Sequence, residues 1–317
     1  MKAIIVGVSG QDGSHMADFL LEKGYEVHGV VRRNSQNKFG TAEHLKEKIE
    51  FYYGDITDAN SIDMIIKNVQ PNEIYNFSAQ SHVGVSFQCP FSTMDIVGTG
   101  VLRILEAIRR YSPHSKLYQA SSSEMFGSSK PPQNEDTPFE PQSPYAIAKL
   151  TAHYLVKLYR QAYGIFACSG ICFNHEGERR GSIFVTRLIS KAVAKAYFGV
   201  PVKIQINNLE AKRDWGYAKD YIKAMWMMLQ QDKPDDYVIA TGEAHSVQEF
   251  LEEAFGLADL NWKDYVDVVP SKDRPLDVNF LLGDSSKARK ELDWKPEVGF
   301  KELVKIMVES DIKELDD

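Results

Sequence analysis

Short apolar runs alternate with helical stretches through the first half of the chain. Apolar, β-rich runs occupy positions 3–8, 25–31, 49–55, 73–79 and 116–123, and helical stretches lie between them. Strands that are apolar throughout and alternate with helices are typical of a parallel sheet covered on both faces. The pattern therefore predicts an α/β fold with a doubly wound, Rossmann-type parallel sheet. Such a sheet binds ligands at the carboxyl ends of its strands.

The composition and the periodicity of the chain change near position 173. A helix is predicted over 144–163, because Ser143 suits the N-cap and Pro144 the first helical position. An apolar strand follows over 166–173, and beyond it the chain has more charge, more loops and weaker periodicity. We expect a Rossmann domain over residues 1–173 with a returning segment at about 214–242, and a smaller mixed α/β domain over residues 174–317.

Composition narrows the class of protein. The chain has 317 residues, 43% of them hydrophobic, and a net charge of -7, so no basic face for nucleic acid is expected. Its three cysteines, Cys89, Cys168 and Cys172, are too sparse for a disulfide framework. The last two lie in an apolar run, which favours buried thiols over a metal site. No apolar run is long enough to span a membrane, and the first residues show no cleavage-site pattern, so we expect a cytoplasmic location.

A glycine-rich turn follows the first predicted strand and opens a helix. Its GxxGxxG spacing allows a tight turn and a close approach of the backbone to a pyrophosphate, which the helix N-terminus then faces. An ordinary strand-to-helix turn is the less favoured alternative in this position. The residues that we expect to hold a dinucleotide here are Gly7, Ser9, Gly10, Gln11, Asp12 and Gly13.

The end of the second predicted strand favours NADP over NAD. NAD sites usually carry an acid there for the ribose 2′-hydroxyl, whereas this strand ends in Arg32, Arg33, Asn34 and Ser35. Guanidinium groups suit a 2′-phosphate in charge and geometry. After the third strand, Asp55 and Ile56 are predicted to face the adenine. An equally plausible role for Asp55 is that of a turn residue or helix cap.

Tyr145 and Lys149 are four residues apart and share one face of the predicted helix. A nearby cation stabilises a phenolate, so we expect Lys149 to lower the pKa of Tyr145, which could then take a proton from a hydroxyl. Ser122 lies at a strand end and can bond the same substrate oxygen. Glu124 adds a second base that a simple alcohol oxidation does not need, and this suggests a further proton transfer. On its own, Glu124 could equally be a surface or helix-start acid.

Together these motifs resemble the extended short-chain dehydrogenase/reductases and, more closely, the GDP-mannose 4,6-dehydratase family. The resemblance spans nearly the whole chain. It rests on GQDGSHMADFLLEKGYEVHGVVRR, NFSAQSHVGVSF, ASSSEMFG, SPYAIAKL, GICFNHEGERRGSIFVTR, NLEAKRDWGYAKDYIKAMWMMLQ, RPLDVNFLLGD and LDWKP. The chain departs from the family pattern where GERR follows FNHE in place of the usual SPRR, and where Ser122 replaces a threonine.

The resemblance implies an NADP-dependent dehydration of GDP-mannose to GDP-4-keto-6-deoxy-D-mannose. In this reaction Tyr145 would take the proton of the C4 hydroxyl. Glu124 would remove the C5 proton and help the C6 hydroxyl to leave as water, and Lys149 would hold the nicotinamide ribose. Further cofactor contacts that it implies are Phe77, Ala79, Ser81, Ser92, His175 and Arg180. Substrate contacts that it implies are Ser81, Asn174, Glu176, Arg179, Asn208, Lys212, Arg213 and Arg274.

Two other functions remain open at this point. One is a related enzyme that dehydrates a GDP-heptose or reduces a 4-keto sugar, although a reductase has no need of Glu124. The other is a catalytically silent NADP-binding protein, which would be expected to lose Tyr145 or Lys149. The family also implies a homodimer or homotetramer, in which the segment 32–40 reaches a neighbouring subunit's cofactor or is simply a surface loop.

Overall fold

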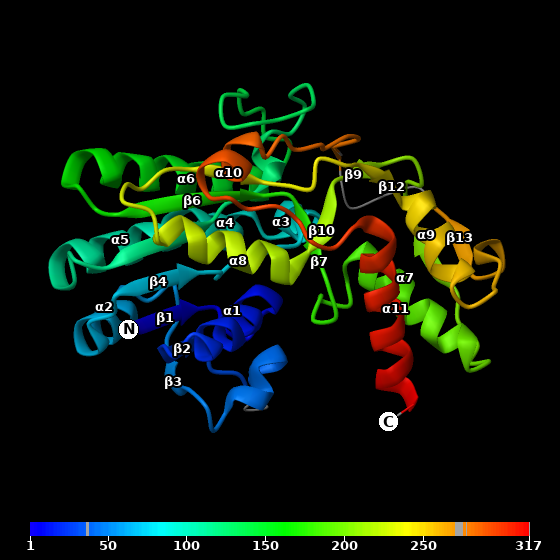
Figure 1. Ribbon diagram of the computed structural model, residues 1–317, viewed down its shortest axis with the longest axis horizontal. Helices are drawn as coiled ribbons and strands as arrows, with labels where there is room; N and C mark the ends of the chain where they lie inside the picture. Colours follow the sequence, from blue (N-terminus) through cyan, green and yellow to red (C-terminus); the bar gives the residue numbers. More distant parts are fainter. Residues whose placement is uncertain (36–37, 270–274, 277, 317) are drawn as a thin grey trace.

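A seven-stranded parallel sheet forms the centre of the molecule (Figure 1). The computed structural model describes residues 1–35, 38–269, 275–276 and 278–316. The strands lie in the order β11-β6-β5-β4-β1-β2-β3, and every neighbouring pair is parallel. Their carboxyl ends therefore meet at one edge. The strands are β1 (Lys2–Val6), β2 (Glu26–Val31), β3 (Glu50–Tyr53), β4 (Glu73–Asn76), β5 (Lys116–Ala120), β6 (Ala167–Cys172) and β11 (Tyr237–Ile239).

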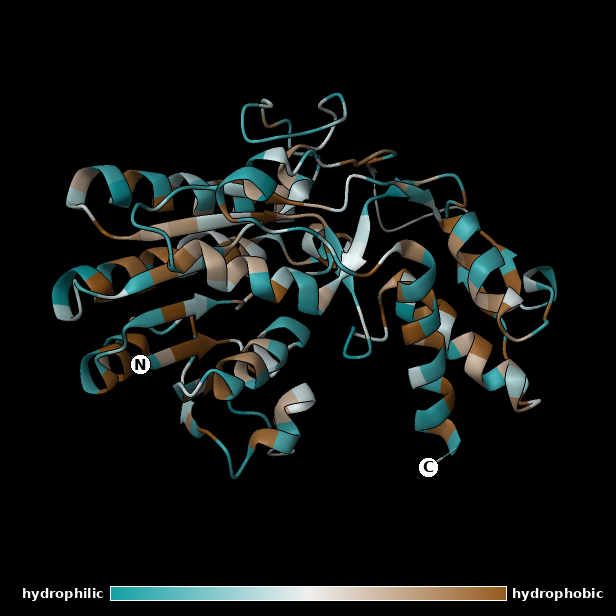
Figure 2. Cartoon of the chain, viewed as in Figure 1, coloured by the Kyte–Doolittle hydropathy of each residue, from teal (hydrophilic) through white to brown (hydrophobic). Residues whose placement is uncertain are grey.

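Helices cover both faces of this sheet, and each face has its own apolar core. The helices on one face are α1 (Gln11–Glu22), α8 (Ala218–Leu229) and α10 (Ser286–Glu291). Those on the other face are α2 (Ala59–Val69), α5 (Gly100–Tyr111) and α6 (Pro144–Tyr163). Figure 2 shows hydrophobic residues along β1, an interior strand of the sheet. Burial on both faces explains why these strands are apolar throughout rather than alternating.

A smaller region packs beside the carboxyl edge of the sheet, on the right of Figure 1. Its apolar core lies between three helices and includes Trp215, Phe250 and Met307. The helices are α7 (Val185–Tyr197), α9 (Val247–Gly256) and α11 (Phe300–Asp316). Its short strands pair as β7 (Asn174–Glu176) with β10 (Trp215–Tyr217), β8 (Ile204–Ile206) with β13 (Val266–Val268), and β9 (Lys212–Arg213) with β12 (His245–Ser246).

Short helical segments connect these elements. They are the 3₁₀ helices η1 (Gly40–Leu45), η3 (Ser123–Met125) and η4 (Trp262–Asp264), the helices α3 (Val83–Gln88) and α4 (Pro90–Thr93), and the π-helical turn η2 (Met94–Thr99).

The predicted fold class is confirmed, and most element boundaries agree with the pattern. Helix α6 spans the predicted 144–163, and β11 pairs with β6 at the edge of the main sheet. Strand β1 ends at Val6, two residues early, because Gly7 turns the chain with a φ of 86°. The domain boundaries at 173 and 214–242 stay a prediction.

Other expectations of the sequence concern cysteines, metals and membranes. Cys168 and Cys172 are buried free thiols, and burial raises the pKa of each to about 12. Across the described ranges, no group of three or more His, Cys, Asp or Glu side chains is arranged to hold a metal ion. In the same part of the chain, no helix is long and apolar enough to cross a membrane.

The N-cap of α6 generates a stability prediction. The Ser143 hydroxyl accepts a hydrogen bond of 3.1 Å from the amide of Ala146. We expect Ser143→Ala to lower the free energy of unfolding by about 1 kcal/mol, because that amide loses its partner. Urea unfolding of the purified variant measures the change.

The matched control is Thr151→Ala in the same helix, whose hydroxyl donates to the Ile147 carbonyl. That carbonyl is already an acceptor in the helix, so we expect a change within about 0.5 kcal/mol. An equal loss of stability in both variants would contradict the capping role of Ser143.

Candidate active site

A cavity of about 690 Å³ opens at the carboxyl edge of the sheet, between the sheet and the smaller region. The structure brings most of the predicted site residues together in its lining. These are Gly7, Ser9, Gly10, Gln11, Asp12, Gly13, Phe77, Ala79, Ser81, Ser122, Glu124, Tyr145, Lys149, Asn174, His175, Glu176, Arg179, Arg180, Asn208 and Arg213. The roles that the sequence suggests for them stay predictions.

The glycine turn leaves no room for side chains at two of its three glycines. A Cβ on Gly7 would lie 2.9 Å from the amide nitrogen of Ser78, and a Cβ on Gly13 only 2.4 Å from the Gly7 carbonyl oxygen. A Cβ on Gly10 would meet nothing closer than 3.6 Å. Gly7 and Gly13 thus allow the strand, the turn and α1 to pack closely, as in dinucleotide-binding turns.

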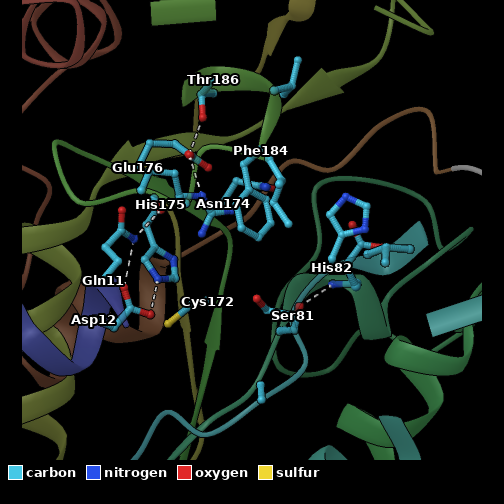
Figure 3. A pocket seen from close by; sticks show the side chains of 18 of the residues that line it. Gln11, Asp12, Ser81, His82, Cys172, Asn174, His175, Glu176, Phe184 and Thr186 are labelled. Carbon is cyan, nitrogen blue, oxygen red and sulfur yellow. Dashed lines mark hydrogen bonds and ion pairs between the residues drawn. The ribbon is translucent and has the colours of Figure 1, made fainter. Parts of the chain in front are cut away.

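Asp12 and His175 form an ion pair across the cavity, with 2.9 Å between Oδ2 and Nε2 (Figure 3). The other ring nitrogen of His175 lies 2.8 Å from the Phe173 carbonyl oxygen. Gln11 donates to both the Asp12 carboxylate and the His175 carbonyl. The His175 ring also stacks on Tyr221 of α8, with 4.9 Å between centroids. These contacts tie the start of α1 to β7.

The electrostatics of this pair favour the charged forms of both partners. Burial alone would raise the pKa of Asp12, but the charge and hydrogen bond of His175 outweigh it and lower that pKa. Burial alone would lower the pKa of His175, but the Asp12 carboxylate and the Phe173 carbonyl raise it. With acceptors at both nitrogens, the ring is held as an imidazolium.

Tyr145 and Lys149 lie at the floor of the cavity, and both are buried. Burial raises the pKa of the Tyr145 phenol, while a hydrogen bond with Ser122 and the charge of Arg180 act in the opposite direction. Burial lowers the pKa of Lys149 to about 8. The Lys149 ammonium donates to the Ala120 carbonyl at 2.7 Å and lies 5.7 Å from the Tyr145 ring centroid.

The pKa of Tyr145 is thus raised in this structure, whereas we expected it to be lowered, and the role of Lys149 stays a prediction. Burial disfavours the charged form of both groups, so it raises the pKa of the Tyr145 phenol and lowers the pKa of the Lys149 ammonium. The groups that favour the phenolate are Ser122 and Arg180.

Glu124 follows the end of β5 in the short helix η3. Its backbone amide bonds the Ser122 hydroxyl at 3.2 Å, which caps η3. Its carboxylate is half-buried, lines the cavity, and is close enough to Tyr145 for its charge to raise the pKa of the phenol. Within the described residues, that carboxylate makes no side-chain hydrogen bond or ion pair, which leaves it available for proton transfer.

The loop after β7 carries two neighbouring arginines that point to different partners. Arg180 pairs with Glu176 at 2.9 Å, and its guanidinium lies 3.6 Å from the Phe184 ring centroid. Glu176 is itself 1% exposed and accepts a 2.5 Å hydrogen bond from Thr186. Arg179 instead pairs with Asp18 of α1 at 2.7 Å. The two predicted substrate contacts Glu176 and Arg179 are thus engaged with the protein itself.

Several predicted site residues lie outside the cavity lining. The side chains that follow β2 are exposed, and Ser92 is exposed on α4. The Asp55 carboxylate accepts the amide and hydroxyl of Thr57, which is the turn role left open above. Arg274 lies outside the described residues. The members of this set that are described are Arg32, Arg33, Asn34, Ser35, Asp55, Ile56, Ser92 and Lys212.

The lining also contains residues that sequence reasoning missed. Thr41 contacts the glycine turn through a 2.8 Å bond from its hydroxyl to the Gly10 carbonyl. Nothing in the sequence marks it, because the contact joins segments that are far apart along the chain. The same holds for the apolar and amide side chains that the smaller region contributes. Among the missed residues are His82, Phe184, Thr186, Leu188, Gln205, Asn207, Trp215 and Val247.

The fold and the site together define an extended short-chain dehydrogenase/reductase. A parallel sheet carries a glycine turn after β1, a serine at the end of β5 and a Tyr-x-x-x-Lys pair on α6, all at one cavity. The chain is similar to the UDP-glucose 4-epimerase of Thermus thermophilus, whose structure contains NAD. That match has a TM-score of 0.88 and 26% identity, and it covers 98% of this chain and 99% of the epimerase chain.

The sequence comparisons place the chain more narrowly. The family described as GDP-mannose 4,6 dehydratase matches residues 4–307. GDP-mannose 4,6 dehydratase 2 of Arabidopsis thaliana is 52% identical, over 98% of this chain and 87% of the relative. The human GDP-mannose 4,6 dehydratase is 48% identical, over 98% of this chain and 91% of the relative. The chain belongs to the GDP-mannose 4,6-dehydratase family.

The Asp12–His175 pair generates a pH-dependent prediction. The raised pKa of His175 adds stability that is fully present below the ordinary value of 6.5 and is lost as pH rises through the folded-state pKa. The lowered pKa of Asp12 adds stability that is present above its ordinary value of 3.8. We therefore expect Asp12→Asn to cost on the order of 2 kcal/mol at pH 6 and clearly less at pH 9, measured by urea unfolding.

A carboxylate that pairs with arginine provides the control. Asp95 pairs with Arg103 at 2.7 Å, so this ion pair contains no imidazole. The cost of Asp95→Asn should be the same at both pH values. A cost of Asp12→Asn that does not change with pH would show that His175 is not held as an imidazolium.

Proposed function

We propose that the protein converts GDP-mannose to GDP-4-keto-6-deoxy-D-mannose and water, with NADP as a recycled cofactor. The observation that carries this proposal is the set of three groups at one end of the cavity. Tyr145, with Ser122 as its hydrogen-bond partner, suits oxidation of a hydroxyl. Glu124 adds a carboxylate that has no side-chain partner in the described part of the chain, and an oxidation or reduction alone does not need such a group. Membership of the family supports the same reaction.

The residues of the glycine turn fit a dinucleotide. The turn is free of side-chain bulk at Gly10, where a pyrophosphate would approach the first amides of α1. The buried side-chain oxygen of Gln11 has no hydrogen-bond partner within the described residues, so it offers an acceptor in the cavity. Bound there, the cofactor would accept the hydride of sugar C4 and later deliver it to C6, so that no external reductant is consumed.

The choice of NADP over NAD rests on Arg32 and Arg33. They follow β2, which pairs with β1 in parallel register with Val30 opposite Val6, so both arginines emerge at the edge where the glycine turn begins. They are exposed and free to meet a 2′-phosphate from outside the cavity. The position of Arg32 and Arg33 supports NADP, although neither side chain lines the cavity.

Tyr145 acts first in the proposed reaction. Its side chain acts as a phenolate, which the Ser122 hydroxyl and the Arg180 guanidinium stabilise, and it becomes a phenol when it takes the proton of the C4 hydroxyl. Lys149 is buried with its ammonium fixed on the Ala120 carbonyl, and we place its free donors at the ribose. The C4 ketone then acidifies the proton on C5.

Glu124 acts second. Its carboxylate removes the C5 proton, and the resulting carboxylic acid protonates the C6 hydroxyl, which leaves as water. A double bond forms between C5 and C6. When C6 receives the hydride, C5 regains a proton from the Tyr145 phenol, which returns to the phenolate. One carboxylate serves both the proton removal and the departure of water, so the site needs no second acid.

The smaller region supplies the candidate contacts for the GDP group. Arg213 lines the cavity and is only 8% exposed, so its charge can act on a diphosphate in a largely dry site. Asn208 lines the same cavity, where its side-chain oxygen accepts the amides of Glu210 and Ala211. Asn174, at the start of β7, also lines this cavity.

We also propose a homo-oligomer, a dimer or a tetramer, in the cytoplasm. Phe91 on α4 is 91% exposed, and Tyr154 and Leu158 on the adjacent α6 are 54% and 53% exposed. A monomer would leave these large apolar side chains in water. A second copy of the chain is the occupant that we propose, and a monomeric mass in solution would contradict it.

The activity itself is the first test. Purified protein supplied with GDP-mannose and NADP should form a 4-keto-6-deoxy product without added reductant, and more slowly with NAD. Mass spectrometry of the nucleotide sugar measures the loss of one water. A panel of GDP-, UDP- and dTDP-sugars provides the comparison. Turnover of another GDP-sugar in place of GDP-mannose would overturn the assignment of the sugar.

The second test isolates Glu124. We expect Glu124→Gln to abolish exchange of the C5 proton with solvent deuterium and to lower kcat by about 10²–10⁴-fold, since the amide cannot accept that proton. Nuclear magnetic resonance of the substrate in deuterium oxide measures the exchange. Glu140→Gln is the control, because Glu140 bonds Ser128 at the surface. Normal exchange in Glu124→Gln would remove Glu124 from its role.

A further inference from the structure

Arg187 joins the loop of the cavity to the C-terminal helix. It stands in the first turn of α7, and its side chain is 6% exposed. One end of the guanidinium donates to the backbone carbonyls of Gly177 and Glu178. The other nitrogen pairs with Asp311 at 2.8 Å and with Glu314 at 2.9 Å, both on α11. Residues near the end of the chain thus anchor the group that holds this loop.

Among the residues that the structure describes, no other cation near the Asp311 carboxylate is as deeply buried as Arg187. It is 1% exposed and accepts a 2.5 Å hydrogen bond from Ser190, one turn after Arg187 in α7. The burial of such a group is costly unless a charge compensates it. Lys191 reaches only Glu314, at 3.4 Å, and from the surface. The Arg187–Asp311 pair is therefore the buried charge contact between α7 and α11.

The loop that Arg187 holds, residues 177–180, sends its side chains in three directions. Glu178 pairs with Lys219 at 2.7 Å, at the start of α8. Arg179 pairs with Asp18 of α1, and Arg180 pairs with Glu176. The charge of Arg180 also acts on Tyr145. A shift of the backbone at 177–178 would move all three contacts together, because those carbonyls immediately precede Arg179 and Arg180 in the chain.

We propose that Arg187 is a positioning residue, which uses α11 as its anchor to hold the 177–180 loop, and thereby Arg180, at the catalytic end of the cavity. Arg187 itself does not line the cavity. The inference rests on the proposed function for its kinetic consequences, but not for the placement of the loop. It assigns α11, the last helix of the chain, a part in the active site that it does not touch.

A consequence for the chemistry follows from the charges that face Tyr145. The Arg180 guanidinium favours the phenolate, as does the hydrogen bond with Ser122, whereas Glu124 and Asp12 oppose it. Lys149 lies 5.7 Å from the ring centroid. If Arg180 moves away, the remaining charges raise the pKa of Tyr145 further. Activity would then need a higher pH.

The test removes the buried pair as a whole. In Arg187→Met alone, Asp311 would stay buried without its cation and the chain could fail to fold. The double variant Arg187→Met with Asp311→Leu removes both charges and keeps apolar volume, so we expect it to fold. Lys191→Met is the matched control, since it removes a cation that pairs with Glu314 but does not reach the loop.

Three measurements distinguish positioning from a general loss of stability. In the double variant, amide hydrogen exchange should become faster in peptides that cover 177–184, but not in α9. KM for GDP-mannose should rise on the order of tenfold. The acid limb of the pH profile of kcat should move up by about half a unit. Lys191→Met should match the unaltered protein in all three.

The outcomes separate this inference from the proposed function. A folded double variant with unchanged exchange at 177–184 and an unchanged pH profile would overturn the positioning role. If the unaltered protein does not turn over GDP-mannose, the proposed function fails, but the exchange measurement still decides whether Arg187 holds the loop. Faster exchange with an unchanged pH profile would show that the loop moves without Arg180, which also contradicts the inference.

Discussion

The ion pair between Asp12 and His175 joins the two halves of the cavity. Asp12 belongs to the first turn of α1, directly after the glycine turn, and His175 belongs to β7, where the chain leaves the main sheet. Burial alone would disfavour each charge, and each partner is charged because the other is. The pair therefore fixes the distance between the glycine turn and the smaller region, and the width of the cavity between them depends on that distance.

Burial at the end of the cavity that holds Tyr145 has a cost that the surrounding groups offset only in part. A dry cavity strengthens every charge interaction inside it, but it also disfavours the phenolate of Tyr145 and the ammonium of Lys149. Ser122 and Arg180 act against that effect, whereas Glu124 adds to it. In the proposed reaction, the base for the second proton transfer thus makes the first one harder. Arg180, from a different part of the chain, supplies a charge that favours the phenolate.

The sequence predicts the sheet, the glycine turn and the Tyr145–Lys149 helix, because these are local patterns with a strong physical cause. Apolar runs report burial, glycines report close backbone approach, and Ser143 and Pro144 report a helix start. The sequence does not predict which side chains pair with one another in the folded chain. The engagement of Arg179 with Asp18, and of Glu176 with Arg180 and Thr186, depends on which segments meet in space. For the same reason the sequence does not show that the Lys149 ammonium donates to the carbonyl of Ala120 at the end of β5.

The side chains and the backbone of the 177–180 loop make separate sets of contacts. Its two arginines are neighbours in sequence, yet one braces α1 and the other faces Tyr145. The backbone before them is held by charge, from Arg187 and through it from α11. The GERR segment, residues 177–180, thus combines side-chain contacts to α1 and to Glu176 with a backbone that Arg187 contacts, and its Arg180 lies over the Phe184 ring.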